Sequence, residues 1–129
     1  MTASLVLLAE DDEDVRALAE LVLRREGFEV TAVANGEAAL EAADARTPAV
    51  AVLDVSMPHV DGLETARRLR ERGATFPIML LTARVTEADR ERGRLAGADA
   101  QLDKPFSPSV LAERVRALCE DGPTRENDR

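Results

Sequence analysis

Four short apolar runs in this chain each lead to a residue type that can do chemistry. The types are carboxylates, a hydroxyl and an ammonium, and the ammonium is unusual because Lys104 is the only lysine among 17 basic residues. Arginine carries a rigid planar fork whereas lysine carries a compact point charge, so a small site can require lysine. In chain order, Glu10 and Asp11 follow Leu5–Ala9, Asp54 follows Ala49–Leu53, Thr82 follows Ile78–Leu81, and Lys104 follows Ala100–Asp103.

Together these residues indicate a site for phosphoryl transfer. Carboxylates crowded into one pocket raise the pKa of at least one of them or bind a cation. Hard oxygen ligands that leave room for water suit Mg²⁺, with Mn²⁺ as the alternative ion. Beside such an ion, Lys104 and Thr82 would neutralise and bind a phosphoryl group, and a carboxylate can be the nucleophile.

Other polar residues nearby have simpler explanations. Asp12, Glu13 and Asp14 precede a predicted helix, where acids interact favourably with the positive end of the helix dipole. His59 is a lone histidine in an expected loop, which favours neither a metal ligand nor a phosphorylation site. Asp54 is different, because it directly follows a buried strand, where solvation does not explain an acid.

Composition excludes several classes of function. The chain has 129 residues, enough for one domain with a core, and its net charge of −8 argues against a nucleic-acid or anionic-membrane surface. Trp and Tyr are absent, so there is no aromatic platform for nucleobases. A single Cys119, expected to be buried or half-buried, suits a reducing compartment, and Leu5–Ala9 is too short for a signal peptide or membrane span. We therefore expect a cytoplasmic protein.

Apolar runs alternate along the chain with segments of helical periodicity. This alternation predicts an α/β fold, a doubly wound parallel sheet of five strands with helices on both faces. The expected strands are Leu5–Ala9, Glu29–Val33, Ala49–Leu53, Ile78–Leu81 and Ala100–Asp103, and the expected helices are Val15–Arg25, Glu37–Ala45, Gly62–Arg72, Glu87–Leu95 and one starting at Pro108.

Helix ends and apolar stripes refine this prediction. Asn35 and Ser107 are expected to cap helices, and Gly27, Gly73 and Gly97 to end them. The stripes expected to face the core are Val15, Leu18, Ala19, Val22 and Leu23 in the first helix and Val110, Leu111, Val115 and Leu118 in the last. We expect one domain over residues 1–120, and a polar tail or the start of a linker over residues 121–129.

Functional sites of doubly wound sheets lie outside the carboxyl ends of the strands. Four of the five expected strands bring a reactive side chain to that edge, and the motifs that carry them are Leu7-Leu8-Ala9-Glu10-Asp11-Asp12, Leu53-Asp54-Val55-Ser56-Met57-Pro58 with Asp61-Gly62, Leu81-Thr82-Ala83, Gly97-Ala98-Asp99 and Lys104-Pro105-Phe106. With these motifs in this order, the chain resembles the response-regulator receiver domains of two-component signalling, from about Leu5 to Leu118. The resemblance implies the flavodoxin-like strand order 2-1-3-4-5.

The resemblance also implies roles for individual residues. Asp54 matches the phospho-accepting aspartate, Asp11 the direct Mg²⁺ ligand, Glu10 a neighbour acting through a metal-bound water, Ser56 a metal ligand through its backbone carbonyl, Thr82 the hydroxyl that binds the phosphoryl group, and Lys104 the cation paired with it. Arg16, five residues after Asp11, sets this register. Ser56 and Arg84 match positions that tune loss of the phosphoryl group, and Lys104-Pro105 matches a frequent cis bond.

A phosphorylation-controlled signalling domain is the function this resemblance implies. Asp54 would accept a phosphoryl group from a histidine kinase or phosphotransfer protein, and an output partner or domain would respond. The alternative is a binding module of the same fold whose output is independent of phosphorylation. An enzyme such as an aspartyl phosphohydrolase would need an acid two residues beyond Asp54, where Ser56 stands, and a flavin site would need a phosphate loop after the first strand. We therefore expect a regulator that is not an enzyme, although it assists its own phosphorylation and dephosphorylation.

Two features depart from the family pattern, the residue three positions before Lys104 and the charges of a dimer face. Gln101 stands three residues before Lys104, where family members often carry an aromatic residue that turns inward on activation. Thr82-Ala83-Arg84 and the segment after Lys104 look most like receivers of winged-helix regulators, which dimerise through charge pairs. Arg90, Asp99 and Arg114 fit such a face, but Ala100 and Val110 replace expected acids, so we expect a monomer or weak homodimer.

Overall fold

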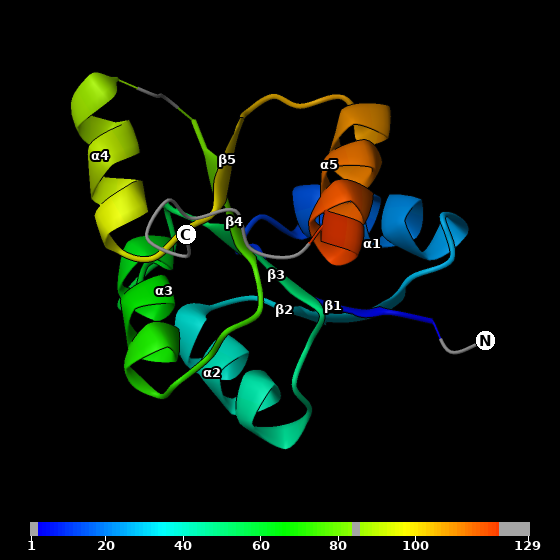
Figure 1. Cartoon of the computed structure of the whole chain (residues 1–129). Coiled ribbons are helices and arrows are strands. Elements are labelled where there is room, and N and C mark those ends of the chain that lie inside the picture. Colours follow the sequence, from blue (N-terminus) through cyan, green and yellow to red (C-terminus); the bar gives the residue numbers. More distant parts are fainter. Residues whose placement is uncertain (1–2, 84–85, 122–129) are drawn as a thin grey trace.

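The computed structural model describes residues 3–83 and 86–121, and within them five parallel strands alternate with five helices (Figure 1). The sheet has the order β2-β1-β3-β4-β5, as expected. The strands are β1 (Leu5–Ala9), β2 (Glu29–Val33), β3 (Val50–Asp54), β4 (Ile78–Thr82) and β5 (Ala100–Asp103), and the helices are α1 (Glu13–Arg25), α2 (Gly36–Ala45), α3 (Gly62–Glu71), α4 (Glu87–Leu95) and α5 (Pro108–Asp121).

The sheet separates two apolar cores. Helices α1 and α5 lie side by side on one face, as Figure 1 shows, and Leu23 of α1 and Leu111 of α5 pack there against strand residues such as Val52. Helices α2 and α3 cover the other face, where Leu40 and Leu69 pack against Leu53 and its neighbours. Because β1, β3 and β4 are buried on both faces, they are continuous apolar runs without alternation.

Helix boundaries follow the capping signals in the sequence. Asn35 accepts a hydrogen bond from the amide of Ala38 at 2.8 Å, and Ser107 Oγ accepts one from the amide of Val110 at 3.2 Å. Gly27 follows the end of α1 with a φ of 96°, in the left-handed region that glycine adopts without steric penalty. The predicted caps are therefore confirmed.

Two residues of the predicted apolar stripes do not reach the core. Leu18 is 47% exposed and Val110 is 38% exposed, so their expected burial is wrong. In α1 only Ala19 and Leu23, four residues apart, are fully inside, and Leu18 lies about 100° around the helix from Ala19. The set of apolar residues predicted from the sequence to face the core is therefore wider than the part of the helix surface that the sheet covers.

Strands β1 and β3 are parallel neighbours at the point where the strand order reverses, so their carboxyl ends lie together at one edge of the sheet. Strand β1 pairs with β2 on one side and β3 on the other, with Ala9 in register with both Val33 and Leu53. Glu10 and Asp54, which directly follow Ala9 and Leu53, therefore lie next to each other at this edge of the sheet. Among the described residues, no helix is long and apolar enough to cross a bilayer.

Candidate functional site

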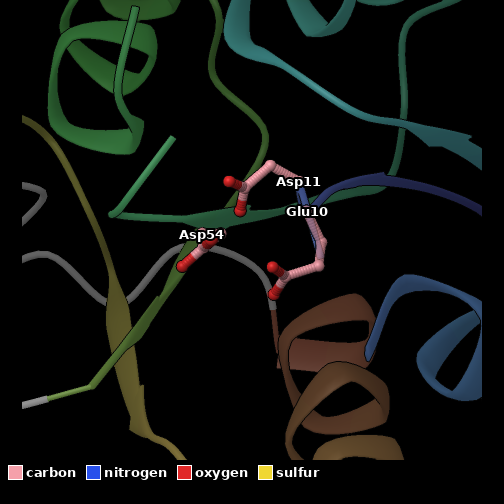
Figure 2. Close-up of side chains that lie close together, drawn as sticks. All are labelled: Glu10, Asp11 and Asp54. Carbon is pink, nitrogen blue, oxygen red and sulfur yellow. The ribbon is translucent and has the colours of Figure 1, made fainter. Parts of the chain in front are cut away.

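Three carboxylates converge where β1 and β3 end (Figure 2). One carboxylate oxygen from each of Glu10, Asp11 and Asp54 lies within 4.8 Å of the others. Glu10 is fully buried, Asp54 is 2% exposed and Asp11 is exposed. The cluster is therefore anchored in the protein on two sides and open to solvent at Asp11.

Lys104 lies between two of these carboxylates. Its Nζ is 2.9 Å from Glu10 Oε1 and 3.1 Å from Asp54 Oδ1. Thr82, the last residue of β4, is buried, and its carbonyl accepts a hydrogen bond from the Lys104 amide at 2.7 Å. The Lys104–Pro105 peptide bond is cis. The structure thus brings the hydroxyl-bearing strand and the lysine to the same edge as the carboxylates.

Local backbone contacts hold Glu10 and Asp54 in place. The Glu10 amide donates to the Val33 carbonyl at 3.1 Å, which continues the pairing of β1 with β2 beyond the strand. Asp54 Oδ1 accepts a hydrogen bond from the Ser56 amide at 3.3 Å. At Gly62, the start of α3, a Cβ atom would lie 2.4 Å from the Asp54 carbonyl oxygen, so only glycine allows this approach.

Burial dominates the electrostatics of Asp54. Removal from water raises the pKa of Asp54 to about 7, with the Lys104 hydrogen bond acting against this rise and the neighbouring Glu10 adding to it. At Lys104, burial alone would lower the pKa, but hydrogen bonds to Glu10 and Asp54 leave it above its ordinary value. The site therefore holds a carboxylate whose ionised form is disfavoured by burial, beside an ammonium whose pKa is raised.

The donor set fits a hard divalent cation. Three carboxylates within 4.8 Å carry more negative charge than Lys104 alone can neutralise, and all their donor atoms are oxygens. Such ligands suit Mg²⁺ or Mn²⁺, which bind through a few carboxylates and keep several waters. Asp11 is exposed, and the contacts of Asp54 with Lys104 and Ser56 both use Oδ1. Both oxygens of Glu10 are engaged, Oε1 with Lys104 and Oε2 with the Asp12 amide at 3.1 Å, so Asp11 and Asp54 are the more available ligands.

The remaining predicted residues fall in distinct places. Asp12 caps α1, accepting hydrogen bonds from the amides of Asp14 at 2.9 Å and Val15 at 3.1 Å, in agreement with the expected helix N-terminus. Ser56 is exposed and reaches Asp54 through its amide. His59 is exposed with a φ of 67°. Arg84 and the tail from residue 122 lie outside the described residues.

Two contacts were not anticipated from the sequence. Arg16, used there only to set the register, donates from Nη1 to the Glu10 carbonyl at 2.9 Å. Gln101 donates a hydrogen bond from Nε2 to the Arg90 carbonyl of α4 at 3.0 Å. A Cβ atom at Gly93 would lie 2.4 Å from this Nε2, so glycine at that position leaves room for the Gln101 side chain. The glycine in the middle of an otherwise polar helix was the signal for the second contact.

Cys119 is half-buried, as expected, and burial raises the pKa of its thiol.

The family model of the response regulator receiver domain matches residues 6–116. Among curated proteins, the chain is 47% identical over 113 residues to the transcriptional regulatory protein TctD of Salmonella typhimurium, covering 88% of this chain and 50% of TctD. It is 39% identical over 113 residues to the alkaline phosphatase synthesis transcriptional regulatory protein PhoP of Bacillus subtilis, covering 88% of this chain and 47% of PhoP. The chain thus spans about half the length of these relatives.

Solved structures show the same architecture over most of this chain. The receiver domain of the Francisella response regulator 1452 superposes with a TM-score of 0.87 at 29% identity, covering 92% of this chain and 98% of that one. A response regulator from Chloroflexus aurantiacus superposes with a TM-score of 0.86 at 36% identity, covering 92% of this chain and 99% of that one.

Proposed function

We propose that this chain, which belongs to the family of response regulator receiver domains, accepts a phosphoryl group on the side chain of Asp54. The donor would be a sensor histidine kinase or a phosphotransfer protein. In the transfer, the phosphorus–nitrogen bond of a donor phosphohistidine breaks as a bond forms between phosphorus and an Asp54 carboxylate oxygen. The non-enzymatic role of a regulator follows, with the domain assisting the gain and loss of its own phosphoryl group.

The observation that carries this proposal is the position of Lys104. Its Nζ lies 3.1 Å from Asp54 Oδ1 and 2.9 Å from Glu10 Oε1, so one ammonium already contacts the accepting carboxylate. A phosphoryl group on Asp54 would add oxygens within reach of Lys104, and of Thr82 after a modest movement. An arginine would not fit this narrow place between two carboxylates as well as a lysine.

Metal binding completes the proposed site. Asp11 and Asp54 would hold Mg²⁺ or Mn²⁺ directly, with Glu10 behind and the Ser56 carbonyl as a further ligand. Bound there, the cation neutralises negative charge on the phosphoryl oxygens during transfer. Asp54, which burial makes costly to ionise, would be kept ionised and oriented by the metal, Lys104 and the Ser56 amide.

The relatives support a proposal for the output of the domain. TctD and PhoP are described as transcriptional regulatory proteins and are about twice as long as this chain. We propose that residues 1–120 are the regulatory unit and that its phosphorylation changes contacts with an output domain or a separate partner. The alternative, an output that does not need phosphorylation, has no support from the site, where Asp54, Thr82 and Lys104 lie together.

A direct test is phosphorylation by acetyl phosphate in Mg²⁺, followed by intact mass. The wild type should gain one phosphoryl group and Asp54→Asn should gain none. Asp103→Asn, which removes an exposed aspartate at the same edge of the sheet, is the matched control and should behave as wild type. An undiminished adduct in Asp54→Asn would refute the assignment.

A further inference from the structure

Strand β1 ends one residue before the acidic pair, and the chain must turn sharply there to start α1. Glu10 is fully buried, its amide is paired with Val33, and its carbonyl needs a partner because an unpaired buried carbonyl is costly. Arg16, from the first turns of α1, supplies that partner through Nη1 at 2.9 Å. The guanidinium therefore closes the turn from the side of the helix.

The hydrogen bond from Arg16 holds the peptide group that joins Glu10 to Asp11. The Glu10 carbonyl and the Asp11 amide belong to one planar unit, so fixing that carbonyl fixes the direction in which the backbone enters Asp11. The Glu10 side chain is fixed independently, because its Oε2 accepts from the Asp12 amide at 3.1 Å and its Oε1 contacts Lys104. For Asp11, which is exposed, the backbone on its N-terminal side is held through Arg16.

Ion pairing does not explain why an arginine occupies position 16. None of the ion pairs within the described residues includes Arg16, although four acids, Asp12, Glu13, Asp14 and Glu20, lie within four residues of it. A cation placed beside a cation site lowers the affinity of that site for a metal through repulsion. Its geometric effect and its electrostatic effect on metal binding therefore have opposite signs.

From these contacts we propose that Arg16 is a positioning residue for metal binding, which aims Asp11 at the cation by holding the Glu10 carbonyl. The inference rests on the proposed function, since it takes Asp11 as a metal ligand. Partners of metal ligands typically change metal affinity by 10- to 100-fold when they are removed. Loss of the Arg16 contact should fall near the lower end, because the Asp12 cap still fixes the C-terminal side of the turn.

Titration calorimetry with Mg²⁺ on the full chain tests whether Arg16 strengthens or weakens metal binding. Arg16→Ala should weaken binding about tenfold, whereas a purely electrostatic role would make it tighter. Arg16→Lys keeps one donor for the carbonyl and should recover most of the affinity. Arg25→Ala removes an exposed arginine from the same helix and should leave affinity within about twofold of wild type.

Phosphorylation by acetyl phosphate gives a second measurement. The Arg16→Ala defect should disappear at saturating Mg²⁺, because only the placement of a ligand is lost and not a group that touches the phosphoryl group. A defect that persists at saturation, or tighter metal binding in Arg16→Ala, would overturn the proposal.

Amide hydrogen exchange separates this inference from the proposed function. In metal-free protein, protection of the Asp12 amide, which donates to Glu10 Oε2, should fall in Arg16→Ala and stay unchanged in Arg25→Ala. A wild type that binds no Mg²⁺ yet shows this exchange pattern would refute the metal site and leave the turn-closing role of Arg16. A wild type that binds Mg²⁺, with Arg16→Ala unchanged in affinity and exchange, would refute the role of Arg16 alone.

Discussion

Replacing Asp54 with asparagine should stabilise the metal-free protein above pH 7 and have little effect near pH 4. Asp54 is 2% exposed, and burial raises its pKa from 3.8 to about 7 in spite of the adjacent Lys104. Asparagine keeps an oxygen that can accept from Lys104 and Ser56 but carries no charge. The variant therefore removes the cost of ionising a buried carboxylate with little change in shape.

The sign and size follow from the two pKa values. Because the folded-state pKa lies above the unfolded one, the folded protein binds more protons between them, so stability is full below pH 3.8 and is lost as pH rises to about 7. Each pH unit in that interval corresponds to about 1.4 kcal/mol, so the loss is at most about 4 kcal/mol. That is a large fraction of the stability of a domain of this size.

Urea unfolding of wild type and Asp54→Asn at intervals from pH 4 to pH 8, in a chelator, measures this difference. The free energy of unfolding of Asp54→Asn minus that of wild type should grow by a few kcal/mol across the range. Glu41→Gln, at an exposed position on α2, is the control and should show no such growth. Saturating Mg²⁺ should stabilise the wild type and reduce the difference, since an ion bound to the folded state alone adds stability. A difference independent of pH, or a wild type more stable than Asp54→Asn at pH 8, would refute the reasoning.

Three further predictions concern the metal, the lysine and the surface. Asp11→Ala should abolish or severely weaken Mg²⁺ binding in titration calorimetry, whereas Asp12→Ala should leave it nearly intact while losing about 1 kcal/mol of stability with the helix cap; the reverse order would show the register to be wrong by one residue. Lys104→Arg should fold and accept a phosphoryl group slowly but fail to change conformation on phosphorylation, as followed by amide hydrogen exchange, and wild-type behaviour would contradict the need for a compact ammonium. Sedimentation velocity with beryllofluoride, a stable phosphoryl mimic, should show a monomer or weak dimer, because exposed charge pairs are weak; a micromolar dimer abolished by Arg114→Glu would contradict this.

The sheet and the site were predictable because they depend on the ends of elements. A buried parallel strand needs a continuous apolar run, and the first polar residue after it must lie at the sheet edge, so Asp54 and Thr82 could be placed from spacing alone. The exposure of Leu18 and Val110 could not, because it depends on how wide a strip of each helix the sheet covers. The contact of Lys104 with Glu10 also needed the structure, since it depends on the length and direction of two flexible side chains.

Gln101 shows where reasoning from residue type alone was incomplete. From the sequence, a glutamine in place of an aromatic residue would gain little from burial, and an amide buried without partners is costly. In the structure Gln101 is only half-buried, and its Nε2 has a partner in the Arg90 carbonyl at 3.0 Å, over a glycine that leaves the space free. Thr82 and Gln101 also line one cavity of about 250 Å³. The position is therefore joined to α4 by a hydrogen bond instead of by ring packing.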